Sequence, residues 1–128
     1  MVRKAHGPQF VRFGMPASHE AMMYKLSLVR ELGLRYDTSY RIAADYKFTY
    51  EFLNAAKNFA RVDIPVIKFS EGGISTANKW KGLSEACRVR REIGSLSLSH
   101  RLFIRLAQSA ALILSTYAAP LYRWLRLR

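Results

Sequence analysis

Residues 42–59, IAADYKFTYEFLNAAKNF, carry the clearest periodic pattern in the chain and decide the expected fold. The apolar positions that recur there at near-helical spacing are Ile42, Tyr46, Leu53 and Ala56. This spacing predicts a helix over 42–59. Directly after it, residues 61–69 alternate apolar and polar side chains around Pro65, which is typical of an edge strand. A helix joined to a strand favours an α/β layer.

The remaining chain predicts two further helices before the C-terminal region. A short helix is expected over 25–32, because Gly33 stands where a helix is commonly capped. A charged helix is expected over 78–93. Its expected inward side chains are Trp80, Leu83, Cys87 and Ile93. Residues 1–17 are expected to be loop, and 18–24 fits either a short strand or the start of a helix.

The positive charge is unevenly distributed along the chain. Residues 1–95 hold all nine acids and carry +7 of the net +12, whereas 96–128 carries five arginines and no acid. The uncharged stretch 106–122, LAQSAALILSTYAAPLY, has the length of only a marginal bilayer span and contains polar residues. From Leu98 to Tyr117 the apolar residues recur at helical spacing, and Arg101 and Arg105 lie toward another face. This pattern predicts an amphipathic helix lying on a membrane surface. Packing of this helix on the domain is the alternative.

Length and composition narrow the class of protein. A chain of 128 residues suits one domain with a modest core, here expected over 1–95 and followed by the helical region 96–128. Half of the residues are hydrophobic, which argues against overall disorder. The single cysteine, Cys87, excludes an internal disulfide and a thiolate zinc site, which favours a reducing compartment. The basic start lacks the apolar run of a secretory signal.

Several common catalytic motifs are missing from the sequence. It contains no D-x-D pair, no H-E-x-x-H zinc helix and no P-loop, since Gly72 and Gly73 lack the Gly-Lys-Ser ending. No G-x-S-x-G elbow supports a serine nucleophile, although a Ser–His–Asp triad stays open.

Four segments occur in an order that points to one family. They are the stretch around SHEAMMY beginning at Ser18, YDTSYRIAADYKF from Tyr36 to Phe48, GGIST from Gly72 to Thr76, and a later helix bearing Glu85. Together, across about residues 14–93, they resemble the C-terminal half of the inverting glycosyltransferases of family two, nearest the exopolysaccharide and colanic-acid branch. The resemblance implies an α/β fold: the acceptor-side half of a GT-A glycosyltransferase fold, followed by the amphipathic C-terminal helix.

The resemblance also implies roles for individual residues. Asp45 corresponds to the general base that deprotonates the acceptor hydroxyl, and a carboxylate near a helix N-terminus suits that role. His19 corresponds to a residue beside the donor–acceptor cleft, and a purely structural histidine is an equal alternative. The acceptor-side loop is expected to contain Gly72, Gly73 and Ser75, with an ordinary connecting turn as the alternative. A basic face carrying Arg88, Arg90 and Arg91 is expected to be solvated, with an acceptor phosphate as the other possibility.

The family's donor-binding half has no counterpart in this sequence. In the complete enzymes that half holds a divalent metal, Mg²⁺ or Mn²⁺, against the diphosphate of the nucleotide sugar, and no metal site is expected in this chain alone. We therefore expect a truncated or split transferase, inactive alone, that acts on a glycan or lipid-linked acceptor with a donor-binding partner chain. Its expected location is cytoplasmic, peripheral on the inner membrane.

A protein without catalytic activity is the alternative. A small basic protein could bind a membrane surface or nucleic acid, because a charge of +12 attracts phosphates and aromatic rings can stack on bases. Nucleic acid is the weaker of the two, because no recognisable nucleic-acid-binding motif is present and much of the charge adjoins an apolar helix.

Overall fold

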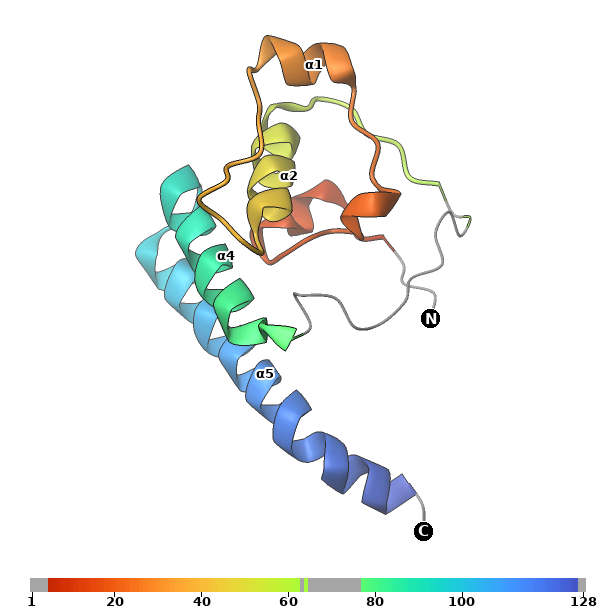
Figure 1. The fold of residues 1–128 in the computed structure, drawn as a ribbon, viewed down its shortest axis with the longest axis vertical. Coiled ribbons are helices and arrows are strands. Elements are labelled where there is room, and N and C mark those ends of the chain that lie inside the picture. The colour runs from red at the N-terminus through yellow and green to blue at the C-terminus, as the bar shows by residue number, and fades with distance from the viewer. Residues whose placement is uncertain (1–4, 63, 65–76, 127–128) are drawn as a thin grey trace.

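The computed structural model describes residues 5–62, 64 and 77–126, with the backbone alone for 118–126. The described chain begins with two short 3-10 helices, η1 and η2, and continues through four α-helices (Figure 1). Their bounds are η1 Pro8–Arg12, η2 His19–Ala21, α1 Leu26–Glu31, α2 Ala44–Ala55, α4 Lys79–Ile93 and α5 Leu98–Arg126.

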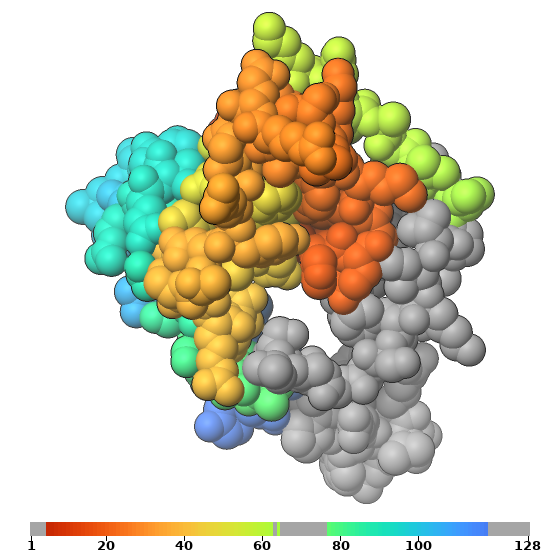
Figure 2. Space-filling view, turned by 45° about the horizontal axis from the view of Figure 1, so that its top comes forward, coloured from red at the N-terminus to blue at the C-terminus, as the bar shows by residue number. Residues whose placement is uncertain are grey.

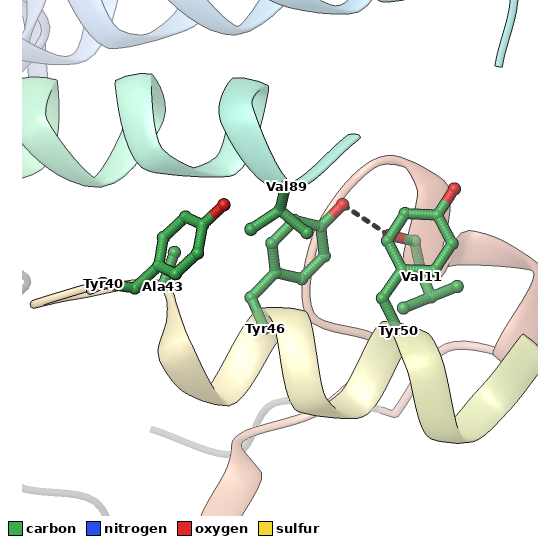
Figure 3. Packing of buried hydrophobic residues seen from close by; sticks show 6 residues of the cluster. All are labelled: Val11, Tyr40, Ala43, Tyr46, Tyr50 and Val89. Carbon is green, nitrogen blue, oxygen red and sulfur yellow. Dashed lines mark hydrogen bonds between the residues drawn. The ribbon is translucent and has the colours of Figure 1, made fainter. Parts of the chain in front are cut away.

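The core lies between α2 and α4 and is rich in tyrosine. Tyr46 and Tyr50 extend from α2 toward Val89 of α4, as Figure 3 shows. Tyr50 is fully buried, and the Tyr46 hydroxyl donates to the Val11 carbonyl at 2.8 Å. Burial raises the pKa of Tyr46 to about 12. The hydrogen bond satisfies the polar end of a ring that otherwise contributes apolar area, so tyrosine suits this small core.

A buried arginine fastens the N-terminal segment to α4. Arg90 is 1% exposed, and its Nε donates to the Arg12 carbonyl at 2.8 Å while Nη2 donates to the Phe13 carbonyl at 2.9 Å. The Phe13 carbonyl also accepts from Gln108 of α5. The carbonyls of the last residue of η1 and of the residue after it therefore accept hydrogen bonds from side chains of both long helices, which keeps η1 against the core.

The helices α4 and α5 lie side by side, and the second half of α5 extends past the rest of the molecule (Figure 1). Ile104 is the buried side chain of α5. On the opposite side of the core, α1 and the loop that follows it (orange to gold) lie over α2 (Figure 2). The first turns of α5 are thus part of the packed body, whereas the later turns project from it.

The α/β fold, and with it the GT-A expectation, is wrong for the part of the chain that the structure describes. None of the described residues forms a strand, and α2 packs on α4 and η1 instead of on a sheet. Extended backbone does occur, for example at Met22 and Ala56, but without a neighbouring strand. Alternation alone does not make a sheet, because a strand must also find a partner for its backbone hydrogen bonds. Most of the expected strand over 61–69 lies outside the described residues.

The expected helices are confirmed with changed ends. The helix expected over 42–59 is α2, which stops at Ala55. That over 25–32 is α1, and Gly33 caps it at φ 62° with a Schellman pair: the Leu34 amide donates to the Val29 carbonyl and the Gly33 amide to the Arg30 carbonyl. The helices expected over 78–93 and in the C-terminal region are α4 and α5.

The inward face of α4 is only partly the expected one. Ile93 packs on the core as expected, but Trp80 is exposed, and the buried residues of α4 are Val89 and Arg90. Small residues also contribute to the contact, since a Cβ added at Gly82 would lie 3.3 Å from the Ile42 side chain and Ala86 packs on the core. Small side chains let α4 approach α2 closely. The position of the large Trp80 side chain therefore did not indicate which face of α4 is buried.

Candidate active site

Asp45 lies in the first turn of α2, where two features hold its carboxylate. Its Oδ1 accepts a hydrogen bond from the Tyr46 amide at 2.7 Å. Its Oδ2 lies 3.5 Å from Nδ1 of His19, a residue 26 positions earlier in the chain. The carboxylate remains 30% exposed and is therefore open to a ligand.

His19 begins the 3-10 helix η2 and faces two carboxylates. Besides the contact with Asp45, its Nδ1 lies 3.6 Å from Oε2 of Glu20. Glu20 accepts a hydrogen bond from the Ser18 hydroxyl, which is the main cause of its lowered pKa, and its own backbone amide acts in the same direction. The Nδ1 atom of His19 thus lies within 4 Å of both the Glu20 and the Asp45 carboxylate.

A carboxylate from α4 fixes the backbone just before Asp45. Glu85 accepts hydrogen bonds from the Arg41 amide at 3.3 Å, the Ile42 amide at 2.8 Å and the Ala43 amide at 2.9 Å. Burial alone would raise the pKa of Glu85, but these amides outweigh it, and the pKa lies below its usual value. Glu85 thus acts as a cap supplied from another helix, and it positions the first turn of α2.

Aromatic side chains pack along α2 beyond Asp45. The Tyr24 hydroxyl lies 2.7 Å from the Thr49 hydroxyl, and the Tyr24 ring meets Phe48 and Phe52 edge-on. Tyr36 stacks on Phe48 with 4.8 Å between ring centroids and is half exposed. The pKa of Tyr24 is raised, chiefly by burial and further by the charges of Tyr36 and Asp45. This electrostatic effect links the aromatic group to the Asp45 end of α2.

A pocket of about 220 Å³ lies at the start of α2. The residues that line it are Arg41, Ile42, Asn78 and Lys81. Two of the four are basic, so the pocket is suited to an anionic group more than to a neutral one.

The sequence-predicted residues are thus only partly brought together. Asp45 and His19 are in contact, and Glu85 holds the backbone beside them. Gly72, Gly73 and Ser75 lie outside the described residues. Of the basic face, Arg90 is buried, so its expected exposure to solvent is wrong. Arg88 pairs with Glu92 at 2.8 Å and lies over the Tyr40 ring.

The divalent metal implied by the resemblance finds no site in 5–62, 64 and 77–126. In these ranges no three His, Cys, Asp or Glu side chains are grouped so that they could hold a metal ion. Mg²⁺ and Mn²⁺ prefer several oxygen ligands around one point, which His19, Glu20 and Asp45 do not supply as a group. The described residues do not fit this metal, and no step through it is derived.

Comparison of the chain with protein-family models, with curated protein sequences and with solved structures finds no match.

Proposed function

We propose that this chain contributes the acceptor-activating residues of an inverting glycosyltransferase, with Asp45 as the general base. The observation that carries the proposal is the contact between Asp45 and His19, which the chain brings together from separate segments. It is supported by the order of the four sequence segments that resemble family-two transferases. It rests on the side chains and not on an α/β fold.

The proposed step requires a carboxylate that is ionised, partly exposed and held in place. Asp45 accepts the proton of the acceptor hydroxyl while that oxygen forms a bond to the anomeric carbon of the donor. The bond from that carbon to the nucleoside diphosphate breaks at the same time, and the diphosphate leaves with the electron pair. Attack from the face opposite the leaving group inverts the anomeric centre.

The neighbouring side chains have roles in the same proposal. His19 is a positioning residue, since its Nδ1 lies 3.5 Å from Oδ2 of Asp45 and can orient that carboxylate. The exposed Tyr36 ring offers an aromatic face to the apolar side of a sugar. Donor binding and the metal would be supplied by a donor-binding chain. Such a partner would also cover apolar side chains that this chain leaves exposed, among them Met23 and Phe59.

The test replaces the base while keeping its shape. Chromosomal Asp45→Asn is made in the source organism, and its membranes, which contain the other components, are supplied with radiolabelled nucleotide sugars. Incorporation of sugar into lipid-linked and polymeric glycan should fall by about a hundred- to ten-thousand-fold. The matched control is Glu31→Gln, an exposed carboxylate at the end of α1, which should leave incorporation unchanged.

Two results would overturn the assignment. An Asp45→Asn strain with the incorporation rate of the wild type would remove Asp45 from the chemistry. An equal loss in the Glu31→Gln strain would trace the effect to general surface charge and not to a base. Circular dichroism of the purified variants separates either result from loss of folding.

A further inference from the structure

The α5 helix exposes an apolar face that no described part of the chain covers. Its large apolar side chains on this face are between 45% and 77% exposed. They are Leu98, Leu102, Phe103, Leu106, Ile113, Leu114 and Tyr117. At 100° per residue these positions fall within one arc of about 160°. Ile104 and Gln108, which contact the body, lie on the other side of the helix.

A hydroxyl at the edge of this face is satisfied within the helix. The Thr116 hydroxyl donates to the Leu112 carbonyl at 2.8 Å. Such an internal hydrogen bond lowers the cost of moving a hydroxyl into an apolar environment. The helix can therefore bury this edge of its exposed face without leaving the Thr116 hydroxyl unpaired.

The positive charge of α5 distinguishes between two possible partners for its exposed apolar face, a bilayer and a second copy of the chain. No acid follows Glu92 in the sequence, whereas α5 contains four arginines and a fifth ends the chain. Arg105 lies at the edge of the exposed apolar arc. Pairing of α5 with a second copy would place arginines opposite arginines, without the acids that stabilise helix pairs. A bilayer with anionic headgroups offers phosphates beside hydrocarbon, which matches both features.

The length of α5 does not make it a membrane span. At about 1.5 Å per residue the helix is roughly 44 Å long. In the described chain, no helix is long and apolar enough to cross a membrane. A long helix with one apolar face and one basic edge is typical of a helix that lies in the interface.

We propose that α5 binds the surface of an anionic phospholipid bilayer, with its exposed apolar face among the acyl chains and its arginines against the headgroup phosphates. The projection of the second half of α5 beyond the body leaves room for this contact (Figure 1). Membrane binding by α5 requires no glycosyl transfer by Asp45, so the two proposals fail independently.

The experiment is flotation of the full chain with vesicles of phosphatidylcholine alone, or of phosphatidylcholine and phosphatidylglycerol in equal parts. The wild type should float with the anionic vesicles and far more weakly with the neutral ones. Leu106→Ser with Leu114→Ser removes two exposed apolar anchors and should weaken partitioning at least about a hundred-fold. Arg105→Gln should weaken it about five-fold. Both leucines are exposed, so the fold should survive, which circular dichroism checks.

The matched control is Ser115→Ala, which changes the same helix outside the exposed apolar arc and should float like the wild type. The proposal is overturned if the wild type does not float, or if the double leucine variant floats equally well. Flotation that persists in that variant and vanishes in high salt would assign binding to general basic charge. A dimer in analytical ultracentrifugation that the double variant abolishes, without flotation of the wild type, would assign the face to a second copy.

Discussion

The helices α4 and α5 are both basic, yet they use their charge in opposite ways. Five basic and two acidic residues belong to α4, and four arginines and no acid belong to α5. In α4, Glu85 accepts from the amides before α2, Arg90 donates to carbonyls after η1, and Arg88 pairs with Glu92. In α5, the exposed surface is apolar and its arginines have no acid in the same helix.

The difference teaches that a basic helix takes its role from the acceptors around it. Where acids and free carbonyls are within reach, as around α4, positive side chains hold segments of the fold together. Where the helix itself carries no acid, as in α5, an exposed arginine such as Arg105 is available to an external anion. Net charge alone therefore predicts neither role.

The largest expected effect comes from replacing the buried charge of α4. Arg90→Met keeps the apolar stem but removes donors from the Arg12 and Phe13 carbonyls. It should lower the free energy of unfolding by about 3 kcal/mol in urea denaturation. Arg105→Met on α5 is the matched control and should change stability by less than about 0.5 kcal/mol. Equal losses at both positions would erase the distinction between the two helices.

A milder variant at the same position keeps the prediction testable if Arg90→Met does not fold. Arg90→Lys keeps the charge but cannot reach two carbonyls with a planar fork, so its stability should lie between those of the wild type and Arg90→Met. A lysine variant as stable as the wild type would mean that the charge alone, and not the paired geometry, holds the N-terminal segment.

A smaller effect is expected at the acid of α4 that caps α2. Glu85→Gln keeps one acceptor oxygen but removes the charge that binds three backbone amides, which should cost about 1.5 kcal/mol of unfolding free energy. Because Glu85 fixes the backbone before Asp45, NMR shifts of the Asp45 and His19 side chains should change too. Unchanged shifts together with unchanged stability would show that the cap does not position the candidate site.

Sequence periodicity and glycine placement were enough to predict the four α-helices of the described chain, but not η1, which forms in a region expected to be loop. The spacing within 42–59 and the glycine after α1 correctly indicated α2 and the end of α1. The sheet could not be predicted correctly, because alternation over 61–69 describes one strand and says nothing about a partner strand. Tyr46 was predicted among the apolar positions of α2, but the partner of its hydroxyl was not, because only the folded chain brings the Val11 carbonyl near.

The candidate site was only partly accessible from sequence. Locally, Asp45 is a typical first-turn aspartate, and the resemblance to a family, not its spacing, singled it out with His19. The burial of Arg90 was missed because charged residues are seldom fully buried and two exposed arginines flank it in sequence. The small residues Gly82 and Ala86 on the same helix could have revealed the contact face.

The smallest expected effect concerns the ion pairs that Lys47 of α2 makes with Asp37 of the preceding loop and with Glu92 of α4. Lys47 lies 2.7 Å from Asp37 and 3.0 Å from Glu92, and the hydrogen bond from Lys47 is the main cause of the lowered pKa of Asp37. The neighbouring Tyr40 hydroxyl and the Lys47 ammonium group lower the pKa of Glu92 to about 2. A carboxylate whose pKa is lower in the folded state stabilises the fold above its unfolded pKa, about 4.3 for glutamate, and loses this contribution as the pH falls toward the folded value.

Removing the charge of Lys47 should therefore make the stability of the protein depend less on pH below about pH 5. Lys47→Met should be slightly less stable than the wild type at neutral pH, and the difference should shrink progressively as the pH falls below about 5, where the unfolded chain binds protons more readily than the folded carboxylates do. The effect is small because exposed ion pairs are screened by water and salt, so added salt should shrink it further. Thermal unfolding midpoints across this pH range measure it. A difference that stays constant down to pH 2 would mean that Lys47 contributes through packing alone, and that this part of the contact between α4 and α2 owes nothing to charge.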